Sequence, residues 1–318
     1  MLQTTPQKGF RNLTRKPEAM TICIAARCEV ESGLPKIVFC ADRMISAGLQ
    51  FEHGEPKIQW MTPTCLAMIA SSDSLASDMI AKAVLPRFAG KSADTEAVAR
   101  ALGQECIVFK QRKMEQDVLV PLGLTYETVW KKSNELPAEA RDEIMDELLN
   151  YEYGFRTDFL VFGIDFALNV YTPHIYVVDQ DGNVRLQDYL GFGVIGSGAG
   201  MAFPEMTKYK WHRGVTISEA FVRIYNSKRA AERMGGVGVE TDLFALHVFE
   251  GENKVKQVGA WPAPQELRDL LESGRKSAME KDSELYVGIL SQMTKVFVKP
   301  QTRHETQTSE VGSNVNQT

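Results

Sequence analysis

Cysteine is scarce in this sequence and lacks the spacing of a disulfide framework or a zinc site. The 318 residues include five cysteines, an odd number, and no two of them form a CxxC pair. They are Cys23, Cys28, Cys40, Cys65 and Cys106. Three of them lie in apolar runs that are typical of strands, so buried and reduced thiols are expected, as in a cytoplasmic protein.

Long apolar runs are missing as well. The sequence contains no run of about 18 apolar residues, which argues against a transmembrane helix and against a membrane partner. The first 19 residues, MLQTTPQKGFRNLTRKPEA, are basic but contain no apolar segment, so they are not typical of a secretory signal. The sequence therefore predicts a cytoplasmic location.

Basic blocks and paired histidines are also lacking. The net charge is −5 and the body of the chain has no cluster of Lys and Arg, so nucleic acid is not expected as a partner. The GSGAG run after Ile195 lacks the lysine and the spacing of a P-loop. Neither a metal nor a cofactor is predicted, because no two histidines have metal-ligand spacing. The histidines are His53, His174, His212, His247 and His304.

The sequence is rich in short β-branched and apolar segments separated by turn residues. Residues 21–28 and 36–41 predict a hairpin around EVESGLP, and residues 56–61 and 65–70 predict a second pair of strands. Two antiparallel sheets that each need cover on one face fit an α+β fold, a four-layer α/β/β/α sandwich. The remaining strands are predicted at 158–165, 174–179, 184–187, 192–195, 241–249 and 254–258.

Several helices are predicted between and after these strands. A helix is expected over LASDMIAKAVLPRF, and a second from about Thr95 to Asp117. The sequence from Thr216 to Glu219 forms a capping box ahead of a third helix. The predicted buried face of the first is Leu75, Met79, Ile80 and Val84, and that of the third is Ala220, Phe221, Ile224 and Tyr225.

One domain is predicted over residues 21–298, with a helical insertion at about 126–150 and one or two terminal helices. Residues 1–20 are expected to be a propeptide, an arm, or the result of a start codon assigned upstream of the true initiator. Residues 299–318 are polar and free of aromatic side chains, so they are expected to be disordered.

A threonine that follows a methionine opens the first predicted strand, MTICIAARC. Thr21 can act as nucleophile and, through its own α-amine, as general base, but only when that amine is free. Two charged residues follow, Asp42 in FCADRMISAG and Lys57 in PKI. The residues alone leave open a strand threonine, a turn aspartate and a solvated lysine. With residues 1–20 absent, the pattern indicates a hydrolase.

These segments resemble the proteasome β-subunit superfamily of N-terminal-nucleophile hydrolases. The resemblance covers roughly residues 20–90 and 156–250. It depends on the order of MTICIA, FCADRMISAG, PKI, LAMIASSDSLAS, VFGID, YVVDQDGNV and GVIGSGAG. It implies a proteasome-like four-layer fold, assembly into a ring or other homo-oligomer, and hydrolysis of peptide or small amide substrates.

The resemblance also implies a role for individual residues. Thr21 would be the nucleophile, with its α-amine as base directly or through water. Asp42 would orient the terminus and pair with Lys57, and Lys57 would favour an alkoxide-like Thr21. Ser197 matches a serine that hydrogen-bonds near the amine. The oxyanion-binding N–H would come from Ala70, Ser71 or Ser72.

The sequence departs from the family after the third helix. The family often carries an Asp and a Ser, three residues apart, where this chain has Met234 and Val237. The outer support for the terminal amine would then be weakened or built from other residues, and Glu232 and Asp242 are both candidates. This departure favours the alternative function, a non-catalytic scaffold subunit of a proteasome-like oligomer.

The start of the first strand leaves two further points open. Matching the strands without a gap places Met20 on the nucleophile position, whereas a one-residue shift in the long EVESGLP loop places Thr21 there. Self-processing members tend to have Gly before the nucleophile, so Met20 favours removal by an aminopeptidase or no removal at all. The sequence identifies no unfoldase or other activator.

Overall fold

The protein is described by a computed structural model. The chain divides into two compact units, one up to Gln265 and one from Glu266. The structure describes residues 21–28, 34–46, 50–52, 57–90, 93–131, 137–154, 156–208, 211–212, 214–234, 237–250 and 256–297. The predicted arm at 1–20 and the predicted disordered tail at 299–318 lie outside these residues.

One five-stranded antiparallel sheet contains the first two predicted strands. Its order is β10-β1-β2-β11-β12. Cys23 of β1 pairs with Ile195 at the end of β10 and with Ala41 near the end of β2. The start of β1 therefore lies beside the ends of two neighbouring strands. The strands are β1 (Cys23–Cys28), β2 (Lys36–Asp42), β10 (Phe192–Ile195), β11 (Thr241–Glu250) and β12 (Lys256–Pro262).

A second five-stranded antiparallel sheet has the order β5-β6-β7-β8-β9. Its strands are β5 (Ile58–Thr62), β6 (Cys65–Ser71), β7 (Thr157–Ala167), β8 (Val170–Val178) and β9 (Val184–Leu186). Two short strands, β3 (Met44–Ser46) and β4 (Gln50–Glu52), form a separate antiparallel pair. The fold is thus a mixture of helices with two antiparallel sheets.

Alternate residues of both sheets build a shared core. Phe39 of β2 and Phe162 of β7 meet with ring centroids 4.7 Å apart. In β1, β2, β6 and β7 the same cluster takes every second residue, as expected for side chains that alternate between two faces. It includes Cys23, Ala25, Ile37, Phe39, Ala41, Leu66, Met68, Ala70, Leu160, Phe162 and Ile164.

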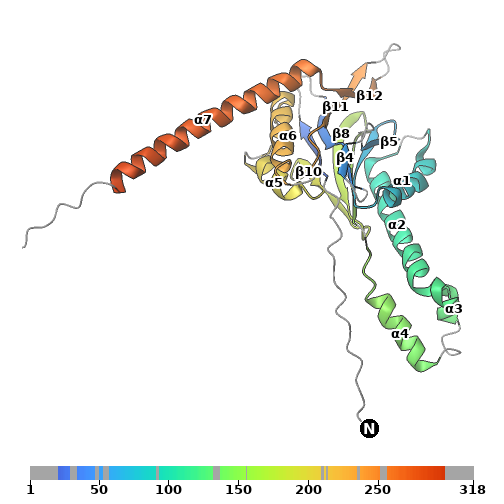
Figure 1. The fold of residues 1–318 in the computed structure, drawn as a ribbon. Coiled ribbons are helices and arrows are strands. Elements are labelled where there is room, and N and C mark those ends of the chain that lie inside the picture. Colours follow the sequence, from blue (N-terminus) through green and yellow to red (C-terminus); the bar gives the residue numbers. More distant parts are fainter. Residues whose placement is uncertain are drawn as a thin grey trace, which may run out of the picture. The chain divides into compact units, whose positions relative to one another are not determined.

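Helices α1 (Ser74–Phe88) and α2 (Thr95–Met114) pack against the other face of the β5–β9 sheet (Figure 1). The predicted buried face of α1 is wrong in part, because Leu75 and Met79 are 68% and 50% exposed. The small side chains of Ala76 and Ala81 are buried in their place and allow the helix to lie close to the sheet. The buried face of α1 consists of Ala76, Ser77, Ile80, Ala81 and Val84.

Helices α5 (Ala199–Thr207) and α6 (Ile217–Ala231) pack on each other, and α6 also packs on β1 and β2 (Figure 1). The predicted capping of α6 is confirmed, since the Thr216 side chain accepts from Glu219 N at 3.2 Å. The predicted face is also confirmed. Its four residues, Ala220, Phe221, Ile224 and Tyr225, are all buried.

The range where an insertion is predicted contains α3 (Tyr126–Lys131) and α4 (Ala138–Leu149). They follow two short segments at the end of α2, η1 (Glu115–Leu119) and η2 (Val120–Leu122), and share a small core with η1. The terminal segment forms a single helix, α7 (Gln265–Phe297). Within the described residues, no helix combines the length and the apolar character that a bilayer span requires.

Candidate functional site

The candidate site lies where β1 begins and β2 ends. Thr21 lies two residues before the start of β1, and Asp42 is the last residue of β2. Lys57 immediately precedes β5 in the facing sheet, and Ser197 follows the end of β10. The antiparallel pairing of β1 with both β2 and β10 brings these strand ends to one place. The structure thus brings together the four side chains that the sequence singled out.

Thr21 is the centre of the cluster. Its Oγ1 donates a hydrogen bond to Asp42 Oδ1 at 2.5 Å, and Lys57 Nζ donates to the same hydroxyl oxygen. Lys57 Nζ also donates to Asp42 Oδ1 at 2.9 Å. The Thr21 main-chain nitrogen donates to Ser197 Oγ at 3.1 Å. The hydroxyl therefore lies between a cation and a carboxylate, while its main-chain nitrogen has a side-chain partner.

Asp42 is a fully buried carboxylate with a partner for each oxygen. Besides the contacts from Thr21 and Lys57, Oδ1 accepts from Ile22 N at 3.0 Å. Oδ2 accepts from Gly238 N at 3.0 Å. A buried charge needs such partners, because leaving it unpaired away from water costs several kcal/mol. These contacts fix the carboxylate in one orientation at the end of β2.

The arrangement is suited to polarising a hydroxyl group. The Lys57 ammonium beside Thr21 Oγ1 favours negative charge on that oxygen, and partial burial strengthens the interaction relative to water. A main-chain nitrogen two bonds from Cβ is close enough to take the hydroxyl proton if it carries a lone pair. An amide nitrogen has no basic lone pair, so the chemistry depends on a free Thr21 α-amine.

Of the three N–H groups predicted as oxyanion donors, on Ala70, Ser71 and Ser72, only that of Ser71 is directed toward the site. Ser72 N donates to Arg156 O at 2.9 Å, across the edge that β6 shares with β7. Ile69 N donates to Lys57 O at 3.3 Å, across the opposite edge. Because N–H groups alternate along a strand, Ser71 N is directed to the Lys57 edge, whereas Ala70 N shares the direction of Ser72 N.

Glu232 and Asp242, the two candidates to support the Thr21 amine, form ion pairs with other residues. Glu232 pairs with Lys228 and with Arg229. Asp242 pairs with Arg43 at 2.5 Å. The region after α6 instead supplies a backbone donor, Gly238 N, which the sequence analysis missed.

Glycines let the backbone after β10 approach Thr21. Gly196 has φ +98°, and a Cβ there would lie 2.2 Å from the Thr21 carbonyl oxygen. Gly198 N donates to that same oxygen at 3.1 Å. Only glycine combines this backbone conformation with so close an approach. The GSG run therefore positions both Ser197 and the Thr21 main chain, a role that its glycine content alone signals only weakly.

The nearby cysteines are unsuited to act as nucleophiles. Burial raises the pKa of the Cys23 thiol, and it raises the pKa of Cys40 to about 12. Both thiols therefore stay protonated at neutral pH, and the thiolate is the reactive form. All five cysteines are buried and free, which confirms the sequence prediction of buried thiols.

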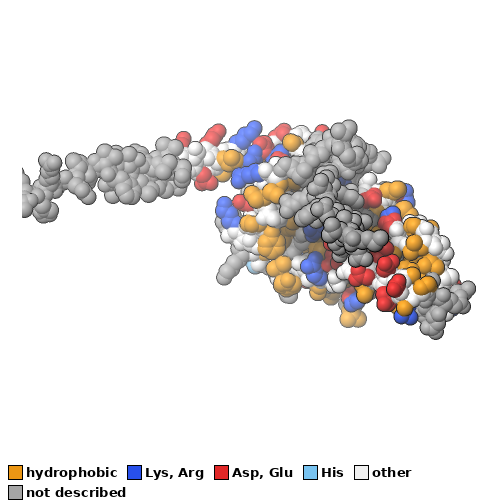
Figure 2. Space-filling view, turned by 60° about the horizontal axis from the view of Figure 1, so that its bottom comes forward, with side chains coloured by type: hydrophobic (Ala, Val, Ile, Leu, Met, Phe, Trp, Pro, Cys, Tyr) orange, Lys and Arg blue, Asp and Glu red, His pale blue; other side chains and the backbone are white. Residues whose placement is uncertain are grey.

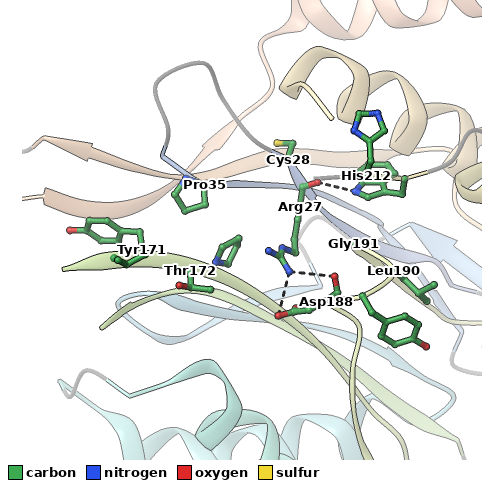
Figure 3. A pocket seen from close by; sticks show the side chains of 13 residues that line it. Arg27, Cys28, Pro35, Tyr171, Thr172, Asp188, Leu190, Gly191 and His212 are labelled. Atoms are coloured by element: carbon green, nitrogen blue, oxygen red, sulfur yellow. Dashed lines mark hydrogen bonds and ion pairs between the residues drawn. The ribbon is translucent and has the colours of Figure 1, made fainter. Parts of the chain in front are cut away.

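A hollow of about 640 Å³ lies at the end of β1 away from Thr21 (Figure 3). Arg27 lies six positions after Thr21 along extended chain, a distance of roughly 20 Å. Arg27 forms an ion pair with the Asp188 carboxylate at 3.4 Å (Figure 3). The same carboxylate is hydrogen-bonded to His174 Nδ1 at 2.7 Å. Because the arginine charge is balanced by Asp188, the hollow does not specify the charge of a ligand.

Other features of the described residues give no further site. They contain no group of three or more His, Cys, Asp or Glu side chains arranged to hold a metal ion. Figure 2 shows charges of both signs interspersed with apolar side chains over one face. The cluster around Thr21 is therefore the best-defined constellation for chemistry.

Comparison with known proteins supports the fold and no finer identity. No family model matches the chain. No curated protein matches it. Among solved structures, the Anbu (Gly-1) mutant from Hyphomicrobium sp. strain MC1 aligns with a TM-score of 0.51 and 15% sequence identity. The alignment covers 83% of this chain and 96% of that chain. At this identity the likeness shows the fold alone, an α+β fold like that of a bacterial proteasome-like protein.

Proposed function

We propose that this chain hydrolyses amide bonds, in peptides or small amides, with Thr21 as covalent nucleophile. One observation carries the proposal: Thr21 Oγ1 is held between the Lys57 ammonium and the Asp42 carboxylate. Three residues far apart in sequence meet at one hydroxyl, which a merely structural threonine does not require. Such a cluster has the form of an activated nucleophile with charge stabilisation nearby.

The proposed reaction begins with attack of Thr21 Oγ1 on the substrate carbonyl carbon. The Thr21 α-amine takes the hydroxyl proton as the new C–O bond forms, and it then gives the proton to the leaving amine as the C–N bond breaks. The product of this half is an ester on Thr21. A water molecule then attacks the ester while the amine takes its proton, and the acid leaves as the proton returns to Oγ1.

Each neighbour of Thr21 has a distinct part in this scheme. Lys57 stabilises negative charge on Oγ1, and Asp42 holds Lys57 and the start of β1 in position. Ser197 Oγ lies against the Thr21 nitrogen and orients it. Ser71 N, directed to the Lys57 edge of β6, is the proposed donor to the oxyanion of the tetrahedral intermediate.

The scheme requires that residues 1–20 be absent from the active form. We propose that translation starts at Met20 and that an aminopeptidase then removes this Met, because these enzymes remove an initiator Met before a small residue such as threonine. The finer features of the proposal are a four-layer α/β/β/α arrangement, a homo-oligomer and a cytoplasmic location. The packing of α1 and α2 on one sheet and of α6 on the other supports the first, and five free cysteines support the last.

The test is an amidase assay on protein that begins at Thr21, with fluorogenic peptide amides as substrates. Thr21→Ala is expected to abolish turnover while circular dichroism and the melting transition remain cooperative. Thr207→Ala, an exposed threonine at the end of α5, is the matched control and is expected to keep full activity. Unchanged turnover in Thr21→Ala would overturn the mechanism.

The second candidate function is a non-catalytic scaffold subunit. Met234 and Val237, in place of the family's Asp and Ser, favour it. This candidate predicts a stable protein that retains residues 1–20 and shows no turnover, and N-terminal sequencing of the purified protein distinguishes the two.

A further inference from the structure

Lys228 is an unusual side chain for the interior of α6. It is 0% exposed, although lysine is almost never fully buried unless it is paired. Its Nζ donates to Gly238 O at 2.8 Å, to Val239 O at 2.7 Å and to the Glu232 carboxylate. Three acceptors thus converge on one ammonium, which satisfies all three of its donors.

Burial opposes the charge that these contacts require. The pKa of Lys228 is lowered from its ordinary value chiefly by burial, and the hydrogen bond to Glu232 acts in the opposite direction. Hydrogen bonds to all three acceptors are needed to offset the free-energy cost of removing this ammonium from water. A Met or Leu would fill similar volume without that cost, so the cation has to be explained by what it binds.

The backbone that Lys228 binds is the same backbone that supports Asp42. Gly238 offers its carbonyl oxygen to Lys228 and its N–H to Asp42 Oδ2, the latter at 3.0 Å. One residue thus links the buried ammonium to the buried carboxylate. Asp42 Oδ1 is thereby left to Thr21, Ile22 N and Lys57.

We infer that Lys228 is a positioning residue for the Thr21 site. It fixes Gly238 and Val239 ahead of β11, so that Gly238 N holds Asp42 Oδ2, and Asp42 in turn holds Lys57 and Thr21. Glu232 balances the charge of Lys228 and does not act on the Thr21 nitrogen. That these contacts serve catalysis rests on the proposed amide hydrolysis. The contacts themselves are independent of that proposal.

The test compares Lys228→Met with Lys82→Met, which removes an exposed lysine paired with Asp78 on α1. Hydrogen exchange followed by mass spectrometry is measured for the segment 237–243 and, as an internal reference, for 159–164 in β7. Lys228→Met is expected to speed exchange in 237–243 by about tenfold or more, the size of one lost hydrogen bond, with the β7 segment unchanged. Lys82→Met is expected to change neither.

Activity gives the second readout. On protein that begins at Thr21, Lys228→Met is expected to lower kcat by about tenfold or more with KM changed less than about threefold, since substrate does not contact Lys228. If wild-type protein shows no turnover, the proposed function is wrong. The hydrogen-exchange measurement then still tests whether Lys228 positions Gly238 and Asp42. Unchanged exchange in 237–243 in a folded variant would overturn that claim.

A second variant keeps the test informative if Lys228→Met fails to fold. Lys228→Met leaves Arg229 as the remaining cation beside the Glu232 carboxylate, and Lys228→Met/Glu232→Gln removes both charges of the buried pair. The double variant is expected to show the same local exchange and the same loss of kcat. If neither variant folds, Lys228 is required by the whole unit, and the claim that it acts locally on Asp42 is overturned.

Discussion

Asp42 gives the sharpest stability prediction, because it is fully buried and both of its oxygens are engaged. In Asp42→Asn, one oxygen becomes an NH₂ donor. If the amide nitrogen takes the Oδ2 position, it faces Gly238 N, and if it takes the Oδ1 position, it faces the Thr21, Ile22 and Lys57 donors. Either orientation sets donors against donors, and both leave Lys57 without its counter-ion.

The magnitude follows from these two losses. A buried group left without its hydrogen bond costs about 1–3 kcal/mol, and breaking a buried ion pair costs about 3–5 kcal/mol. Lys57 keeps 14% of its side chain exposed, so water offsets part of the second cost. We expect Asp42→Asn to lower the free energy of unfolding by about 4 kcal/mol, the low end of the combined cost of about 4–8 kcal/mol.

Urea unfolding followed by circular dichroism measures this loss. Asp78→Asn is the control, since Asp78 and Lys82 form an exposed pair on α1 that is expected to contribute less than about 0.5 kcal/mol. A loss below about 1 kcal/mol in Asp42→Asn would refute the view that this carboxylate holds the site together.

Three further outcomes are expected from the structure. Gly196→Ala, at φ +98° and with its Cβ against a backbone carbonyl, should lower the free energy of unfolding by about 1–3 kcal/mol in urea titrations; an unchanged midpoint would contradict the close approach. Ile80→Ala should cost about 2–5 kcal/mol and Leu75→Ala less than about 0.5 kcal/mol, and equal losses would show that the buried face of α1 is misassigned. The hydrogen bond to Asp188 raises the pKa of His174 above 6.5 in the folded protein, so its contribution to stability is full below pH 6.5 and is lost as pH rises through the folded pKa. Urea unfolding at several pH values should show this fall in wild type and not in His174→Asn.

The helices show what the sequence could and could not predict. The face of α6 was predictable because four large or apolar side chains share one stripe, with a capping box that fixes where the helix begins. In α1 two stripes overlap, and hydrophobicity alone favours Leu75 over Ala76. Close packing on the sheet favours the smaller side chain, and that preference depends on the distance between helix and sheet.

In the candidate site, side chains were predictable and backbone contributions were not. Thr21, Asp42 and Lys57 stand at strand ends in a recognisable order, so their meeting follows once the strands pair. The N–H of Gly238 carries no sequence signal, because every non-proline residue has one and only the path of the chain directs it. Lys228 and Glu232 have visible i,i+4 spacing, but that spacing is more typical of a solvent-exposed helix face.

Covalent labelling of Thr21 tests the central claim most directly. Protein expressed from Met20 would be checked by N-terminal sequencing for a start at Thr21, treated with a β-lactone or an epoxyketone, and mapped by mass spectrometry. One adduct on Thr21, absent from a folded Thr21→Ala variant, is the predicted result. No adduct on a folded protein that begins at Thr21 would contradict the hydrolase and favour the scaffold.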